Sequence, residues 1–406
     1  MAYTFTKLFA CFSRRAKAHT GGDPGAVRLY SDRVLAAPVE SLLDPSLYFH
    51  PSAPDMIDLN QSAPRFESPV SAGRLTADRL GPPPAWGLPE LRDMVAARFG
   101  HKVENVLVTR GASGAFAAAL DAFVNAGDRV VLFDPCSPLF NLGAASRRAT
   151  VRHVAVGCDL AVFRRAVKGA KLVALSIPNN PTGSVIPNET LDEMVAIAAR
   201  AGAVVYIDAT LDVDRKLPSG KRVLAAGSAS AAFGMSGLRV GWLAGPPGLV
   251  RPSALAQALA GPFVPSVCQR VVARVLGEPA SPPTDGPASR RRWASERLNA
   301  AGLRVDGGGE GYFLWADVSA LGLTGREFAE KLLAEHRVLV GPGDLFGPSG
   351  TDFVRVSLAA DDGRVREGLA RIAAFESGRR GTAEVASARV RVDAGAEERP
   401  PAFSRA

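Results

Sequence analysis

Between residues 103 and 245 the chain alternates between short apolar runs and longer segments whose apolar positions recur with helical spacing. The runs are rich in β-branched residues, as is typical of buried strands, and they read NVLVT, RVVLF, KLVALSI, AVVYID, RVLAAG and LRVGWLAG. Helical spacing is clear in SGAFAAALDAFVNAG and NETLDEMVAIAARAG. This alternation predicts an α/β fold, in which helices cover both faces of a mostly parallel sheet. Ligands of such sheets bind beyond the carboxyl ends of the strands, so polar residues just after a strand are candidates for a site.

The pattern also divides the chain into parts. We expect a large domain over residues 55–265 and a smaller α+β domain over 266–376. Residues 1–54 are expected to form an N-terminal arm, and 377–406, which lack sustained apolar periodicity, a disordered tail. The stretch PASPPTDGP, residues 279–287, is predicted to be a linker or loop.

Composition excludes several classes of protein. No apolar run approaches the roughly 18 residues of a membrane span, so we expect no membrane partner. The four cysteines form no CxxC pair and are interpreted as free thiols of a reducing compartment, and the five histidines show no metal-ligand spacing. We therefore expect a cytoplasmic protein without a metal. The basic N-terminal segment, which has no acidic residue before Asp23, leaves an organelle transit peptide as the alternative.

The formal charge of +8 raises the question of a nucleic-acid partner. The basic residues are spread along the whole chain, and the densest cluster, Arg290 to Arg292, begins a predicted helix. No basic face is concentrated enough to indicate such a partner, and we expect none.

The first candidate for chemistry is TRGASGAF, which begins at Thr109. A strand ends here, small residues turn the chain, and a helix is predicted to begin at about Ser113. The free N–H groups at the start of a helix bind anions, which makes this turn a candidate anion site. A tight turn with Ser113 as N-cap is the alternative.

Two further candidates follow the next predicted strands. Asn180 lies in the turn SIPNNPTG, directly after a buried strand. Asp208 ends the apolar strand AVVYID, where a carboxylate is costly to desolvate and favours a cationic partner. A structural salt bridge is the alternative for Asp208.

The stretch SASAAFGMSGLRVGW, residues 228–242, places Arg239 among small residues. Such a loop allows the backbone to approach a compact anion closely, with Arg239 as its one cation. We expect Arg239 to begin a strand. Arg355 lies inside a later predicted strand, DFVRVSLA.

Together, the order and spacing of these motifs resemble the class I/II aminotransferases, which have the pyridoxal-phosphate fold type I. The resemblance covers about residues 55–375 and continues through GYFLWADV, VLVGPGDLFG and FVRVSLA. Each motif is weak alone, but the combination is specific.

The resemblance assigns a role to each candidate. It implies that Ala112, Ser113, Ser228 and Arg239 bind the phosphate of pyridoxal phosphate. It implies that Asp208 keeps the pyridine nitrogen protonated and that Asn180 hydrogen-bonds the phenolic oxygen. Arg355 would bind the α-carboxylate of an amino acid or 2-oxo acid. The resemblance also implies a dimer, either of identical chains or with a different partner, with the apolar segment GPFVPSVCQRVVARVL near the interface.

One element of the family pattern is missing. The family has its Schiff-base lysine directly after Ser-x-Ser, but here Ser228-Ala229-Ser230 is followed by Ala231. The nearest lysines, Lys216 and Lys221, lie upstream, and we expect neither to reach the ring. Any pyridoxal phosphate is therefore expected to bind non-covalently.

Other departures accompany this loss. Leu211 replaces a tyrosine that would contact the phenolic oxygen, Ser137 replaces an aromatic residue that would stack on the ring, and LGPPPAW lacks the tyrosine that precedes GLPELR in the family. Several simultaneous changes indicate natural divergence rather than a single engineered substitution. Two functions stay open: an enzyme that acts slowly or by altered chemistry on an amino acid, and a pseudoenzyme that serves as a binding, regulatory or heterodimer subunit.

Overall fold

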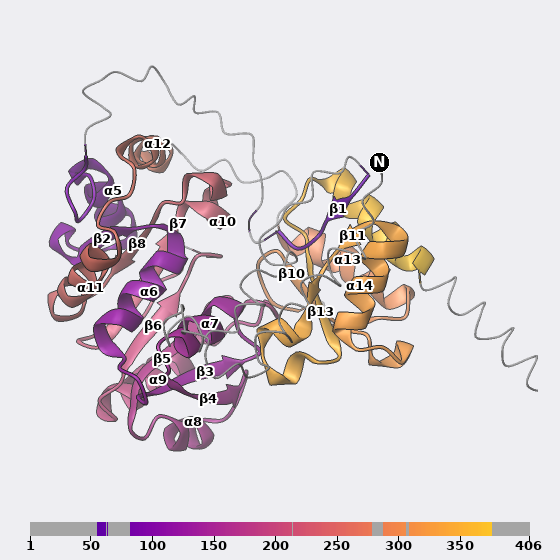
Figure 1. Ribbon diagram of the computed structural model, residues 1–406, viewed down its shortest axis with the longest axis horizontal. Helices are drawn as coiled ribbons and strands as arrows, with labels where there is room; N and C mark the ends of the chain where they lie inside the picture. The colour runs from indigo at the N-terminus through magenta and orange to yellow at the C-terminus, as the bar shows by residue number, and fades with distance from the viewer. Residues whose placement is uncertain are drawn as a thin grey trace, which may run out of the picture.

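The computed structural model describes residues 55–61, 63, 82–212, 214–277, 287–305 and 308–375. The expected N-terminal arm, nearly all of the expected linker and the expected tail lie outside these residues. Within them the chain forms a large part around a seven-stranded sheet and a small part around a four-stranded sheet (Figure 1). None of the helices in the described ranges combines the length and the apolar composition that crossing a membrane requires.

The large sheet has the strand order β2-β8-β7-β6-β5-β3-β4. Its strands are β2 (Val106–Thr109), β3 (Arg129–Asp134), β4 (Thr150–Ala155), β5 (Ala170–Ser176), β6 (Val204–Asp208), β7 (Val223–Ser228) and β8 (Gly241–Ala244). All neighbours are parallel except β8, which runs antiparallel to β2 and to β7. The prediction of a mostly parallel sheet is confirmed. The edge strand β4 escaped the prediction because most of its residues are exposed or half-buried and it has no apolar run.

Helices cover both faces of this sheet, as the alternating pattern predicted. One face packs against α6 (Gly111–Phe123), α7 (Pro138–Ser146) and α11 (Pro247–Ala260). The other face has two separate cores. The first lies under α8 (Leu160–Ala166) and α9 (Asn188–Arg200), and the second under α5 (Pro89–Phe99) and α12 (Ser266–Gly277).

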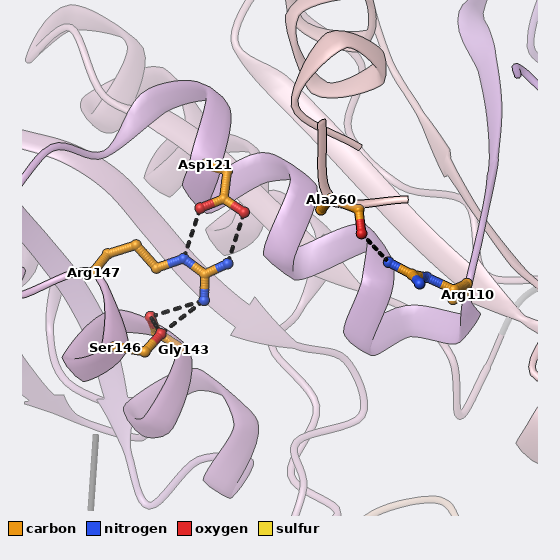
Figure 2. Close-up of polar contacts among 6 residues, drawn as sticks. All are labelled: Arg110, Asp121, Gly143, Ser146, Arg147 and Ala260. Atoms are coloured by element: carbon orange, nitrogen blue, oxygen red, sulfur yellow. Dashed lines mark hydrogen bonds and ion pairs between the residues drawn. The ribbon is translucent and has the colours of Figure 1, made fainter. Parts of the chain in front are cut away.

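Helix α6 is held at both ends by the polar contacts that Figure 2 shows. Near its carboxyl end, Asp121 accepts two hydrogen bonds from Arg147, from Nε at 2.9 Å and from Nη2 at 2.8 Å. At its start, Nη2 of Arg110 donates to the carbonyl of Ala260 at 3.4 Å. A two-pronged ion pair fixes orientation as well as distance, so α6 is locked against α7.

The small part contains the antiparallel sheet β12-β13-β10-β9. Its strands are β9 (Arg304–Val305), β10 (Phe313–Asp317), β12 (Gly341–Pro342) and β13 (Phe353–Ser357), and it packs against α13 (Pro287–Ala300), α14 (Gly325–His336) and helical residues 362–375. Helix α14 begins with a capping box between Thr324 and Glu327.

The border between the two parts differs from the expected one at both ends. Strand β1 (Ile57–Asp58) pairs with β11 (Val338–Leu339), and Ile57 belongs to the core of the small part, although residue 55 was expected to open the large domain. Helix α12 packs on α5 and extends the cover of the large sheet to Gly277, beyond the expected boundary at 265. The local sequence pattern does not predict either shift of the border, because both depend on packing between segments that are far apart in the chain.

The small part lies against the carboxyl edge of the large sheet. The N–H of Cys136, just after β3, donates to the carbonyl of Phe346 at 2.8 Å. The N–H of Ser349 donates to the Asp134 carboxylate, with 3.2 Å to Oδ2. The site therefore lies between the end of the large sheet and the small part.

Candidate active site

The register of the sheet brings the predicted residues to one edge. Ser176, Asp208 and Ala226 are adjacent across β5, β6 and β7. Ser228 pairs with Gly241 of β8, which in turn pairs with Thr109 at the start of the TRGAS turn. Motifs far apart in sequence thus meet where parallel α/β sheets bind their ligands.

At one end of this edge, Arg239 meets the first turn of α6. Its Nη2 lies 3.2 Å from Oγ of Ser113, and Nη1 lies 3.3 Å from the carbonyl of Ser236. The approach is close because Gly111 has no side chain: a Cβ there would lie 2.8 Å from Nη2 of Arg239. An exposed guanidinium, a hydroxyl and free helix N–H groups form a cradle for a compact anion.

Two expectations about this cradle were wrong in detail. Helix α6 begins at Gly111 rather than at about Ser113, so Ser113 lies in the first turn and is not the N-cap. Arg239 is not in a strand. It follows the 3-10 turn Ser236–Leu238 in left-handed backbone conformation, with φ of +52°, two residues before β8 begins. That kink turns the side chain back toward α6, a geometry that the apolar run LRVGWLAG did not indicate.

Ser228 and Ala112 lie beside the cradle. The Ser228 hydroxyl caps the short helix α10 (Ala229–Phe233) by accepting a hydrogen bond from the N–H of Ser230 at 3.0 Å. Its own proton is still available to a ligand. The carbonyl of Ala112 accepts a hydrogen bond from the buried Tyr206 hydroxyl at 3.3 Å, so only its N–H faces outward from the helix start.

Asp208 is held by its own loop rather than by a cation. Its Oδ1 accepts hydrogen bonds from the Thr210 hydroxyl at 2.6 Å and from the Thr210 N–H at 3.0 Å. Burial raises the pKa of Asp208, and the two bonds from Thr210 partly offset that rise. No described residue donates to Oδ2 or forms a salt bridge with this carboxylate, so Oδ2 is available to a protonated ring nitrogen.

Arg355 and Asn180 meet on the side of the small part. Nη1 of Arg355 donates to Oδ1 of Asn180 at 2.9 Å, and Nη2 donates at 2.9 Å to both the carbonyl and the side-chain oxygen of Asn60. The guanidinium lies against the rings of Phe313 and Phe346, with its carbon 4.3 and 4.9 Å from their centroids. Residues of both parts of the molecule therefore hold the Arg355 guanidinium in place.

The environment of Arg355 is that of an incomplete ion pair. The side chain is buried, its Nε has no hydrogen-bond partner, and no carboxylate of the described residues lies within salt-bridge distance of it. Burial lowers the pKa of Arg355 to about 9, against a smaller opposing effect of Asp58. A buried charge without a counter-ion is costly, so the site favours a carboxylate ligand.

Sequence reasoning missed the residues that hold Arg355. Asn60 lies 295 positions from Arg355 in the chain, in a segment with no motif. Phe313 and Phe346 stand in GYFLWADV and VLVGPGDLFG, which the resemblance included without assigning these rings a role. Thr210, which sets the hydrogen bonding of Asp208, was also missed. The Asp-x-Thr spacing that allows a side chain to bond to its own loop was the available signal.

The residues at the expected departures from the family pattern have the following surroundings. Ala231 is buried within α10 and offers only a methyl group. Ser137 is buried at the start of α7, where an aromatic ring would be needed for stacking. Lys216 and Lys221 line a different hollow, on the face of the sheet beside α5, and neither has a hydrogen bond or ion pair with the other described site residues.

These groups suit a phosphorylated pyridine. The cradle of Arg239 and Ser113 suits its phosphate, the available Oδ2 of Asp208 suits its ring nitrogen, and Asn180 lies next to Arg355. The Nε of Arg355 has no hydrogen-bond partner among the described residues, so it can still donate to a ligand. The fold and the site together define a pyridoxal-phosphate-dependent transferase of fold type I.

Comparison with known proteins supports this class of protein. The sequence pattern of the family Aminotransferase class I and II matches residues 54–372. The valine–pyruvate aminotransferase of Mycobacterium tuberculosis is 30% identical, over 79% of this chain and 91% of the relative. A 4-dedimethylamino-4-oxo-anhydrotetracycline transaminase of Streptomyces rimosus is 31% identical, over 73% and 86%. The crystal structure of an aromatic aminotransferase from Pyrococcus horikoshii superposes with a TM-score of 0.73 at 22% identity, covering 80% of this chain and 97% of the other.

The chain belongs to the class I/II aminotransferase family. Members of this family are pyridoxal-phosphate-dependent enzymes that act on amino acids and 2-oxo acids. The resemblance predicted from the motifs is thereby confirmed, as is the fold class.

Proposed function

We propose that this chain binds pyridoxal phosphate non-covalently together with an amino acid or 2-oxo acid, and that the chain alone does not carry out ordinary transamination. The observation that carries the proposal is Arg355, a buried cation that the protein positions and leaves without a counter-ion. A buried cation without a counter-ion contributes little to the stability of the fold, but it binds a carboxylate readily.

Each site residue has a separate task in this proposal. Arg355 orients the α-carboxylate, and Asn180 fixes the guanidinium while its N–H₂ is still available for the phenolic oxygen of the cofactor. Asp208 holds a proton on the ring nitrogen, while Arg239 and Ser113 bind the phosphate. Bound pyridoxal phosphate supplies an electron sink that acidifies the Cα of an attached amino acid.

The missing function is proton transfer and covalent attachment. The methyl group of Ala231 can neither accept a proton from Cα nor form a bond to the cofactor. General acid–base catalysis by a positioned side chain contributes about 10²- to 10⁴-fold in rate. A deficit of this size supports a slow or altered reaction in place of ordinary turnover.

The second candidate function is that of a pseudoenzyme, serving as a binding, regulatory or heterodimer subunit. The observation that favours it is the joint change at three positions around the ring. Ala231 replaces the attachment point, Ser137 replaces the stacking ring and Leu211 replaces the hydroxyl. The carboxylate and phosphate contacts that persist support ligand binding in either case.

The experiment that tests the proposal measures binding and attachment separately. Purified protein is loaded with pyridoxal phosphate, and one half is dialysed while the other is reduced with borohydride and digested for mass spectrometry. We expect dialysis to remove the cofactor and no peptide to carry a reduced pyridoxyl group. A pyridoxyl-lysine at Lys216 or Lys221 would overturn the non-covalent proposal.

Arg355 is tested by calorimetry of the loaded protein with pyruvate and 2-oxoglutarate. Arg355→Gln is expected to weaken binding of both by about tenfold or more, because a charge-assisted hydrogen bond contributes about 1.5–3 kcal/mol. Arg164→Gln, at an exposed position on α8, is the matched control and should bind as the original protein does. If Arg355→Gln fails to fold, Arg355→Lys, which keeps the charge, is measured in its place. Unchanged affinity in the two Arg355 variants would contradict the assignment of Arg355 to the carboxylate.

A further inference from the structure

The guanidinium of Arg355 is almost completely covered by its neighbours. The residue is only 3% exposed, and the rings of Phe313 and Phe346 lie against its charged end. Asn180 and Asn60 bind the two Nη atoms. A ligand that binds this guanidinium must therefore replace one of the groups that now contact it.

The hydrogen bonds of the guanidinium show which group that is. Nη1 and Nη2 each carry two N–H groups. Nη1 uses one of them for Oδ1 of Asn180, whereas two oxygens of Asn60, the carbonyl oxygen and Oδ1, both lie 2.9 Å from Nη2. A two-pronged bond to a carboxylate joins Nη2 either to Nη1 or to Nε, so it always includes Nη2. The carboxylate must therefore displace an oxygen of Asn60.

The main-chain carbonyl of Asn60 is fixed by the residues on either side of it. The N–H of Leu59 donates to the carbonyl of Leu339 at 2.9 Å, and the carbonyl of Leu59 accepts from the N–H of Ser357 at 2.7 Å. The Ser357 hydroxyl donates to the carbonyl of Gln61, also at 2.7 Å. The carbonyl of Asn60 cannot leave Nη2 without breaking these bonds.

The side-chain amide of Asn60 is held less firmly. Its Nδ2 donates to none of the described residues, so the bond from Arg355 to Oδ1 is the one hydrogen bond that the structure shows for this amide. Oδ1 occupies space that Gly341 leaves free, since a Cβ there would lie 2.7 Å from it. Rotation about the Cα–Cβ bond of Asn60 therefore releases Oδ1 while the backbone stays in place.

The amide and a carboxylate differ in charge as acceptors for Nη2. The amide oxygen is neutral and leaves the positive charge of Arg355 without a counter-ion. A carboxylate neutralises that charge, and hydrogen bonds that involve ionised groups are roughly twice as strong as those between neutral groups. Exchange of the amide for a carboxylate is therefore favourable, although the lost amide bond subtracts from the affinity.

We propose that the side chain of Asn60 competes for the carboxylate position on Arg355, and that an amino acid or 2-oxo acid binds by displacing it. Asn60 thereby sets the affinity of the site for its ligand. This inference rests on the proposed function, in which Arg355 binds the carboxylate.

Calorimetry with pyruvate, on protein loaded with pyridoxal phosphate, tests the competition. Asn60→Ala should bind pyruvate about tenfold more tightly, because the carboxylate no longer displaces an acceptor from Nη2. A residue that only positions Arg355 would give the opposite result. Asn188→Ala, at the exposed first residue of α9, is the matched control and should bind as the original protein does. Unchanged or weaker binding in Asn60→Ala would overturn the proposal.

Asn60→Asp tests the same position with a side chain of nearly the same shape. The new carboxylate should neutralise Arg355 from within the protein and weaken pyruvate binding by at least about tenfold. Asn188→Asp adds the same charge at an exposed position and should have no such effect. Pyruvate binding that persists in Asn60→Asp would also overturn the proposal.

Arg355→Gln separates the failure of this inference from the failure of the proposed function. If Arg355→Gln loses pyruvate binding and Asn60→Ala gains none, Arg355 binds the carboxylate and the role given to Asn60 is wrong. If Arg355→Gln binds pyruvate as the original protein does, the proposed function itself is wrong, and the inference with it.

Discussion

Single side chains decide what this site can hold. Arg355 is buried and its pKa is lowered to about 9, yet at neutral pH the group is still protonated and attracts a carboxylate. Because a bound carboxylate would raise this pKa again, ligand binding and the charge of Arg355 support each other. Asp208 is tuned in the opposite sense, since burial raises its pKa and Thr210 lowers it.

Ala231→Lys is expected to restore covalent attachment of pyridoxal phosphate but little turnover. The position lies in α10, with Ser228 and Arg239 at their family spacing on either side, and an apolar, cation-bearing pocket lowers the pKa of an inserted lysine. Leu211 and Ser137 still leave the ring loosely held, and misplacement by about 1 Å can cost about 10²-fold in rate.

Borohydride reduction with mass spectrometry measures attachment, and amino-group transfer to 2-oxoglutarate measures turnover. Ala231→Met is the control of similar length without an amine. Adding Leu211→Tyr to the lysine variant should raise turnover. Full family activity from the lysine alone would refute the pseudoenzyme candidate, and absence of any attachment would refute the cofactor cradle itself.

Thr210→Val should shift the pH dependence of cofactor binding upward. The variant removes a hydroxyl that donates to the Asp208 carboxylate, so the pKa of Asp208 rises further. The carboxylate must be ionised to pair with a protonated ring nitrogen, so affinity is lost first at acidic pH. A bond to a charged group, about 1.5–3 kcal/mol, corresponds to a shift of about one to two pH units.

Fluorescence titration of pyridoxal phosphate between about pH 5 and 9 measures this shift. Thr150→Val, at an exposed position on β4, serves as control. The same pH dependence of cofactor binding in Thr210→Val and Thr150→Val would show that Thr210 has no influence on the pKa of Asp208.

Close packing between elements shapes the phosphate cradle. Strand β8 lies so near the start of α6 that a Cβ on Gly241 would be 2.6 Å from the carbonyl carbon of Gly111. This proximity brings Arg239, just before β8, to the free N–H groups of α6.

Gly241→Ala should therefore displace β8 from α6. We expect a loss of about 1–3 kcal/mol in the free energy of unfolding, as for overpacked cores, together with weaker pyridoxal phosphate binding. Gly237→Ala, in the same loop but with open space around its Cβ, should change neither. Chemical denaturation and cofactor titration measure the two effects, and similar behaviour of the two variants would count against the close approach.

The assembled molecule places its site between two parts and exposes an apolar strip. Arg355 reaches from the small part to Asn180 of the large part, so movement between the parts would change ligand binding. Leu255 and Leu259, one turn apart on α11, are 64% and 93% exposed, and the nearby Phe263 is 49% exposed. Large apolar side chains exposed together indicate a protein–protein interface.

We expect a homodimer that buries this strip. Light scattering should give twice the chain mass at micromolar concentration, and Leu259→Glu should weaken association by at least about tenfold, because a charge would be buried. Ala161→Glu, at an exposed position on α8, is the control. A monomeric original protein would contradict the expectation.

Periodicity and motif order were sufficient for the α/β class, for six of the seven strands of the large sheet and for the family. They also placed Asp208 at the end of its strand and Asn180 in the turn after its strand, and they showed the alanine at position 231. These features are local, since spacing along the chain dictates which side chains follow a strand or share the face of a helix.

Tertiary structure decided the rest. The reversed direction of β8, the left-handed turn at Arg239 and the pairing of Arg355 with Asn60 each depend on contacts between segments far apart in the chain. Long-range packing selects one of several local conformations that are equally compatible with the sequence. In this protein it set the geometry of the site.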